Sequence, residues 1–128
     1  MVLAIRTSED IVRMRQLVRE HAIAQGFSLV DQTKVVTAAS ELARNILNYA
    51  GNGQLAIELV ANGGRKGLKL VFSDKGPGIP DIELAMKDGY TTGGGMGLGL
   101  GGSKRLASEF HIESQVGAGT RVSLTRWK

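Results

Sequence analysis

Apolar residues recur along the chain at two spacings, and these spacings predict its helices and strands. Between residues 8 and 50 they recur every three or four positions, the spacing of one face of an α-helix. Thr7 and Ser8 suit a helix start, and Gly26 suits the end of this first helix. A second helix is expected to begin between Ser28 and Asp31 and to end at Gly51.

Strand patterns precede and follow these two helices. The expected strands are Val2 to Arg6, Leu55 to Val60, Leu68 to Phe72, Phe110 to Ser114 and Thr120 to Trp127. Asn62-Gly63-Gly64 and Gly117-Ala118-Gly119 supply turns for two hairpins. A short helix is expected over Asp81 to Lys87, no regular element over Tyr90 to Gly102, and a third main helix over Ser103 to Glu109.

This order of elements favours an α/β fold, a two-layer α/β sandwich. We expect a mixed sheet that the helices cover on one face. At 128 residues the chain is expected to form a single domain over 1–128 with a hydrophobic core of its own.

Composition excludes several kinds of chemistry. The chain has no cysteine, which rules out disulfides, cysteine-based zinc sites and thiol nucleophiles. No apolar run approaches the roughly 20 residues of a membrane helix, and Met1 to Arg6 is no signal peptide, so we expect a cytoplasmic protein without membrane contact. The net charge of +4 suits an anionic partner such as a nucleotide or nucleic acid.

Glycine is the most informative residue type. Ten of the 18 glycines lie between Gly76 and Gly102. The stretch from Thr91 to Gly102 leads into a predicted helix, and backbone amides at such a junction can cradle phosphate. Met96, Leu98 and Leu100 give this stretch an apolar face that can dock, whereas a flexible linker is the alternative.

Two further groups of polar residues could carry chemistry. Glu41 and Asn45 are four residues apart, so they lie on one helix face, where they could bind Mg²⁺ or form an ordinary solvated pair. Asp74 follows a strand and precedes Gly76-Pro77-Gly78, which could let the backbone pass close to a flat ligand or could simply be a surface turn. Each group alone favours the ordinary structural interpretation.

Other phosphate-binding motifs are excluded. Gly97, Gly99 and Gly102 match G-x-G-x-x-G, but no strand precedes them and no acidic residue follows at the required distance. The chain also lacks the P-loop motif and the signatures of eukaryotic-type kinases.

Taken together and in this order, the three groups resemble the N, G1 and G2 boxes of the gyrase/Hsp90/histidine-kinase/MutL (GHKL) ATPases, whose domain is the Bergerat fold. Gly117-Ala118-Gly119-Thr120 is similar to the smaller terminal box. A closer resemblance is to the RsbT-type serine/threonine switch kinases of bacterial stressosomes. It is carried by residues 39–46, by residues 74–82 and by Lys104-Arg105-Leu106 after the glycine stretch.

The resemblance implies a role for each matching residue. Asn45 would coordinate the Mg²⁺ that bridges the ATP phosphates, Glu41 would be the general base, and Asp74 would bind the adenine amino group. The other nucleotide-binding residues that it implies are Gly76, Gly78, Thr92, Gly97, Gly99, Leu100 and Thr120. Arg44, which matches the switch kinases, could form a local salt bridge or contact a partner, and Lys104 and Arg105 could face phosphate or solvent.

The resemblance also implies a function. It indicates an ATP- and Mg²⁺-dependent serine/threonine protein kinase that phosphorylates a STAS-domain protein and, once released from it, activates a PP2C-type phosphatase. The related anti-sigma factor kinases, which bind a sigma factor, are the first alternative. A non-enzymatic nucleic-acid-binding module is the second, but the basic residues are dispersed and the aromatic residues few, so no nucleic-acid partner is expected.

Overall fold

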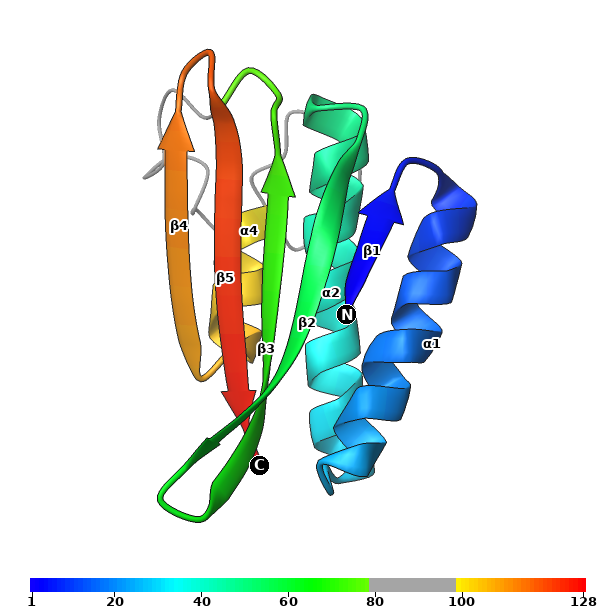
Figure 1. Cartoon of the computed structure of the whole chain (residues 1–128), viewed down its shortest axis with the longest axis vertical. Coiled ribbons are helices and arrows are strands. Elements are labelled where there is room, and N and C mark those ends of the chain that lie inside the picture. The colour runs from blue at the N-terminus through cyan, green and yellow to red at the C-terminus, as the bar shows by residue number, and fades with distance from the viewer. Residues whose placement is uncertain (79–98) are drawn as a thin grey trace.

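The helices and strands form two layers in the computed structural model (Figure 1). The structure describes residues 1–78 and 99–128, and of residues 99–101 the backbone alone. In chain order the elements are β1 (Val2–Ile5), α1 (Ser8–Ala24), α2 (Leu29–Tyr49), β2 (Gly53–Asn62), β3 (Arg65–Asp74), α4 (Gly99–Leu106), β4 (Glu109–Gln115) and β5 (Gly119–Trp127). The strands form one sheet in the order β1-β2-β3-β5-β4, and α1, α2 and α4 lie on one face of it. The predicted two-layer α/β fold is confirmed.

The sheet of the described residues is antiparallel throughout, so the prediction of a mixed sheet is wrong. All four pairings, β1 with β2, β2 with β3, β3 with β5 and β5 with β4, are antiparallel. Strands β3 and β4 are separated by a helix along the chain and point the same way in Figure 1, as two parallel strands would. However, β5 lies between them and pairs with both. This insertion depends on long-range contacts, which the periodicity of single segments does not encode.

The ends of α1 and α2 agree with the sequence prediction. Thr7 and Asp10 form a capping box, in which the Asp10 amide donates to Thr7 Oγ1 over 3.2 Å and the Thr7 amide donates to Asp10 Oδ2 over 3.1 Å. Gly26 follows α1 with φ +83°. The Ser28 hydroxyl caps α2, and Gly51 ends it with φ +82°, a conformation that favours glycine.

Helix α4 differs from the prediction at both ends. The glycines up to Gly102 were expected to exclude regular structure, yet the helix begins at Gly99 and ends at Leu106, and Glu109 belongs to β4. Gly102 and Ser103 are buried, and α4 packs against α2. We attribute the helix to this packing, because small residues let two helices approach closely and tertiary contacts can outweigh the roughly 1 kcal/mol that each glycine costs a helix. The short helix expected over Asp81 to Lys87 lies outside the described residues.

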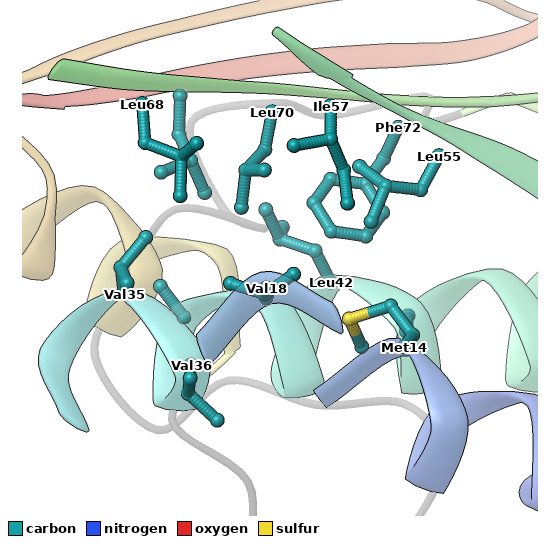
Figure 2. Packing of buried hydrophobic residues seen from close by; sticks show 14 of the residues in the cluster. Met14, Val18, Val35, Val36, Leu42, Leu55, Ile57, Leu68, Leu70 and Phe72 are labelled. Atoms are coloured by element: carbon teal, nitrogen blue, oxygen red, sulfur yellow. The ribbon is translucent and has the colours of Figure 1, made fainter. Parts of the chain in front are cut away.

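A hydrophobic core fills the space between the sheet and the helices. Figure 2 shows side chains of β2 and β3 directed towards those of α1 and α2; those labelled are Leu55, Ile57, Leu68, Leu70 and Phe72 on the sheet and Met14, Val18, Val35, Val36 and Leu42 on the helices. Burying each large side chain of this kind contributes about 1.5–3 kcal/mol before the entropy cost of ordering the chain is subtracted. This core fixes the face of α2 that points away from solvent.

The helix-facing side of the sheet is arranged in rows that cross its strands. Two adjacent rows are apolar: Leu55, Phe72, Val122 and Ile112 pair across four strands, and so do Ile57, Leu70, Leu124 and Phe110. The next row towards one end of the sheet is Gly53, Asp74, Thr120 and Ser114, which we call the polar row. Because side chains alternate between the two faces of a strand, the polar row faces the helix layer as the apolar rows do.

Candidate functional site

Helix α2 brings the predicted pair Glu41 and Asn45 together. The two residues are one turn apart on the same helix face, and both are partly buried. The adjacent residues Leu42 and Ile46 are buried in the core, which fixes the rotation of the helix. The carboxylate and the carboxamide therefore lie at the edge of the apolar stripe, as the sequence predicts.

Arg44 is held locally by Glu41. Its Nη1 donates to Glu41 Oε1 over 2.7 Å, and the Glu41 side chain is 13% exposed whereas that of Arg44 is 52% exposed. The interpretation of Arg44 as a local salt-bridge partner is confirmed. Within the described part of the chain, Oε1 is the only Glu41 oxygen with a polar partner, which leaves Oε2 able to accept a proton or a hydrogen bond.

Asp74 ends β3 and belongs to the polar row. Its Oδ1 accepts a hydrogen bond of 2.9 Å from the amide of Gly76, so the carboxylate is oriented by the turn that follows the strand. The residue is partly buried. One carboxylate is thus held in a fixed direction at the end of the sheet, with lone pairs left for a donor on a ligand.

Gly53 allows the end of β3 to approach α2. A Cβ atom at this position would lie 2.8 Å from Ile46 Cγ2 and 3.2 Å from the Asp74 Cβ. The side chains of Ile46 and Asp74 therefore both approach Gly53. Ile46 directly follows Asn45 on α2. The N-box and G1-box candidates are therefore brought to the same end of the molecule, which the sequence could not show.

The backbone of the Gly76-Pro77-Gly78 turn is packed tightly between two other segments. A Cβ at Gly76 would lie 2.6 Å from that of Ala50, which caps the end of α2. Gly78 has φ +81°, and a Cβ there would overlap the carbonyl oxygen of Gln115. Only glycine fits these positions, so their first role is close packing of the backbone around the site.

Thr120 lies in the polar row beside Asp74. It pairs with Asp74 across β3 and β5, and its Oγ1 is 2.9 Å from the hydroxyl of Ser114. Ser114 was not predicted as a site residue, since serine in an alternating strand gives no distinguishing signal. The structure adds it to the polar row beside Thr120.

The remaining predicted nucleotide-binding residues are only partly described. Thr92 and Gly97 lie outside the described residues. Gly99 is the first residue of α4, and Leu100 is its second, described by its backbone alone. Lys104 and Arg105 in the last turn of this helix are exposed.

Sequence reasoning missed a further charged group at the other end of the helix layer. Arg126 on β5 donates from Nη2 to Asp31 Oδ1 and from Nη1 to the carbonyl oxygen of Leu106, both over 2.8 Å. The hydrogen bond with Arg126 lowers the pKa of the Asp31 carboxyl below its ordinary value. An arginine at an otherwise apolar strand position was the only available signal.

The described residues offer a limited set of donors to a metal ion. No group of three or more histidine, cysteine, aspartate or glutamate side chains in the described ranges could hold one. The Asn45 carboxamide and the Glu41 carboxylate one helical turn away are hard oxygen donors. Mg²⁺ is commonly held by one or two protein ligands together with substrate phosphates and waters. The described residues therefore fit Mg²⁺ bound with a nucleotide, and among themselves they do not form an all-protein metal cage.

A search of the described helices for a membrane span is negative. None of them is both long enough and apolar enough to cross a bilayer.

Comparison with known proteins identifies the family. The family of histidine kinase-, DNA gyrase B-, and HSP90-like ATPases matches residues 30–128. The serine/threonine-protein kinase RsbT of Bacillus subtilis (strain 168) is 54% identical over 123 residues, covering 96% of this chain and 92% of that protein. An anti-sigma F factor of Geobacillus stearothermophilus is 32% identical over 101 residues, covering 73% of this chain and 68% of the relative.

Solved structures show the same fold at lower identity. A structure of the RsbU and RsbW domains of a Mycobacterium tuberculosis protein matches with a TM-score of 0.67 and 21% identity, over 100% of this chain and 33% of that one. The mycobacterial sensor histidine kinase MprB matches with a TM-score of 0.58 and 19% identity, over 99% of this chain and 96% of that one.

These matches agree with the boxes and with the geometry that gathers two of them at one end of the sheet. The expectations of a GHKL-type ATP-binding fold and of a serine/threonine kinase are confirmed. The chain belongs to the histidine kinase-, DNA gyrase B- and HSP90-like ATPase family and, within it, to the RsbT-type serine/threonine kinases.

Proposed function

We propose that this kinase transfers the γ-phosphoryl group of Mg-ATP to a serine or threonine of a STAS-domain protein. We further propose that the kinase, once released from that protein, activates a PP2C-type phosphatase in a stressosome-type partner switch. The chain is proposed to act as a single domain over residues 1–128 in the cytoplasm, where ATP is available. The observation that supports the proposal is the contact of α2 with the polar row at Gly53, where Ile46 approaches Asp74. The proposed metal ligand Asn45 directly precedes Ile46, and the proposed base Glu41 lies one helical turn before Asn45.

The nucleotide would be oriented by the polar row and the turn after it. The Asp74 carboxylate accepts a hydrogen bond from the exocyclic amine of adenine; guanine presents a carbonyl oxygen at that position and would be repelled. Support comes from the Gly76 amide, which holds Asp74 Oδ1 at 2.9 Å. Thr120, fixed by Ser114, lies on the neighbouring strand and contributes a hydroxyl on the same face. Gly76 and Gly78 keep the adjacent backbone free of side chains.

The phosphates would lie between α2 and the glycine stretch that ends in α4. Asn45 supplies a carboxamide oxygen to Mg²⁺, which when bound neutralises charge on the phosphates. The amides of Gly97 and Gly99 and the Thr92 hydroxyl are proposed to line the phosphate side, together with Leu100. A helix that begins with glycines leaves its first amides accessible to an anion.

The chemical step requires a proton acceptor. The substrate hydroxyl oxygen forms a bond to the γ-phosphorus, the bond from that phosphorus to the β–γ bridging oxygen breaks, and ADP leaves. The hydroxyl proton goes to Glu41, whose Oε1 is held by Arg44 so that Oε2 can face the substrate. Positioning and charge neutralisation supply most of the rate enhancement in this class of reaction.

The test is a transfer assay with two candidate partners. The protein is incubated with γ-labelled ATP, Mg²⁺ and either a STAS-domain protein or a sigma factor from the same organism. We expect label on a serine or threonine of the STAS-domain protein, and stimulation of a PP2C-type phosphatase by free kinase in a separate assay. Label on neither protein, with ATP binding intact, would contradict the proposed substrate.

Anti-sigma activity is the second candidate. It is favoured by the 32% identity to an anti-sigma F factor, and disfavoured by the higher identity to the RsbT kinase. Stable capture of the sigma factor by the protein, in place of the STAS-domain protein and the phosphatase, would decide for this alternative.

A further inference from the structure

Arg126 occupies a position on β5 where the sequence pattern calls for an apolar side chain. Val122 and Leu124 precede it on the helix-facing side of the strand, and both are buried. Arg126 pairs with Leu68, itself fully buried. A guanidinium in this row is costly to desolvate, so its partners must explain its presence.

The partners of Arg126 come from two different helices. Nη1 donates over 2.8 Å to the carbonyl of Leu106, the last residue of α4, and Nη2 donates over 2.8 Å to Asp31 in the first turn of α2. The side chains of Arg126 and Asp31 are 17% and 27% exposed. Nε is buried and has no hydrogen-bond partner within residues 1–78 and 99–128. The contact therefore links α4, α2 and β5 in a defined geometry, at the cost of one unsatisfied donor.

The charges of this pair suit the helix ends that they contact. The carbonyl end of α4 carries partial negative charge and meets a cation, whereas the amide end of α2 carries partial positive charge and meets an anion. Arg126 and Asp31 thus hold the end of one helix against the beginning of the other. We call this contact the Arg126 clamp.

Helix α4 extends from the clamp towards the polar row. It has eight residues, which corresponds to a length of about 12 Å. Leu106 is at the clamped end, Gly99 is at the other end, and the helix packs against α2 (Figure 1). On β5, Arg126 is six positions after Thr120, which corresponds to about 20 Å along the strand. A rigid helix held at Leu106 therefore has its glycine-rich beginning aimed at the site end of the molecule.

We propose that Arg126 is a positioning residue for nucleotide binding, which fixes the direction of α4 through Leu106 and Asp31 and thereby the place of the amides that receive the phosphates. This inference rests on the proposed role of Gly99 and of the first amides of α4 in binding phosphate. Ordering this partly buried pair costs desolvation, and replacing such a pair by apolar residues is often neutral or stabilising, so the proposal gives the pair a role other than stability. Stability and nucleotide affinity are then separable properties of this contact.

The experiment replaces the clamp with apolar residues and measures binding. Arg126→Met/Asp31→Leu should retain the thermal stability of the parent protein, while the Kd for Mg-ATP in calorimetry rises about tenfold, within the range of known coupling between remote positions. Hydrogen exchange at the α4 amides should become faster in the nucleotide-free protein. Val18→Ala, which loosens α1 in the core, is the control for a general loss of stability and should leave the Kd unchanged.

An unchanged Kd in the double variant, or equal weakening by Val18→Ala, would overturn the positioning role. If the double variant does not fold, Asp31→Asn replaces it; this variant keeps an acceptor for Arg126 and should raise the Kd by a smaller factor, and an unchanged Kd would again overturn the proposal. Failure of the proposed function is distinguishable: if the protein substrate is wrong, the parent still binds Mg-ATP but transfers no label, and if the nucleotide site is wrong, the parent does not bind Mg-ATP at all.

Discussion

Gly119 lies directly against the backbone of Asp74. Its φ is +110°, and a Cβ atom built on it would overlap the Asp74 carbonyl oxygen. The start of β5 and the end of β3 can therefore be neighbours only because residue 119 has no side chain. This contact sets the position of the carboxylate on which the proposed adenine recognition depends.

Gly119→Ala should damage both folding and nucleotide binding. The overlap with Asp74 and the unfavourable φ should lower the free energy of unfolding by about 3 kcal/mol or more, measured in urea. Gly117→Ala is the matched control, since its φ is +84° but nothing lies within 4 Å of a Cβ. It should cost only about 1 kcal/mol and leave Mg-ATP binding intact. Equal losses of stability and of Mg-ATP affinity in the two variants would show that the contact with Asp74 contributes nothing beyond the unfavourable φ.

Asp74→Asn should weaken ATP binding while the fold is retained. The variant keeps an oxygen for the Gly76 amide but removes the negative charge, and hydrogen bonds to charged groups contribute about 1.5–3 kcal/mol. We expect the Kd for ATP to rise about tenfold in calorimetry. Lys75→Ala, at the exposed neighbouring position, should bind as the parent protein does. An unchanged affinity of Asp74→Asn would refute the adenine role.

Asn45→Ala should abolish Mg-ATP-dependent phosphorylation. The carboxamide is the proposed ligand of Mg²⁺, and the helix tolerates alanine well, so circular dichroism should remain that of the parent protein. Asn48→Ala, an exposed asparagine on the same helix, is the control and should retain full activity. Full phosphorylation by Asn45→Ala would end the assignment of this residue.

Glu41→Gln should separate binding from chemistry. Glutamine can still accept the hydrogen bond of Arg44 but takes up no proton, so transfer should slow by about 100-fold or more, as expected when a general base is lost. The Kd for Mg-ATP should change by less than about twofold, because the base acts in the transition state. Glu58→Gln, exposed on β2, is the control. A transfer rate equal to that of the parent would exclude Glu41 as the base.

Acid should destabilise the protein through two carboxylates. Arg126 lowers the pKa of Asp31 through a hydrogen bond, and the amide of Arg6, followed by that of Thr7, lowers the pKa of Asp10. Because each folded pKa is below the unfolded value of about 3.9, the stabilisation is complete above that pH and is lost as the pH falls through the folded pKa.

The measurement is the melting temperature between pH 6 and pH 2.5. Asp31→Asn and Asp10→Asn should each melt below the parent at pH 6, and the difference should shrink as the pH approaches 2.5. A difference that stays constant with pH would contradict the contribution of these charges.

Much of the fold was predictable from the sequence because it is encoded locally. Apolar spacing placed α1 and α2, and Thr7, Ser28, Gly26 and Gly51 marked their ends, since capping and positive φ depend on neighbouring residues alone. Turn glycines fixed the two hairpins in the same way. The spacing of Glu41 and Asn45 also determined their common face, and the order of the boxes indicated the family.

Other features were decided only by contacts between distant segments. The position of β5 between β3 and β4 depends on which surfaces pack together. So does the start of α4 at Gly99, which the low helix propensity of glycine opposes. Gly53, between Ile46 and Asp74, and Arg126, between Leu106 and Asp31, have roles that appear only when their partners lie beside them. The sequence by itself determined the chemical groups and the elements, except for the two ends of α4. The tertiary structure decided their mutual placement, because burial and hydrogen bonding between segments far apart in the chain do not change the spacing of apolar residues within either segment.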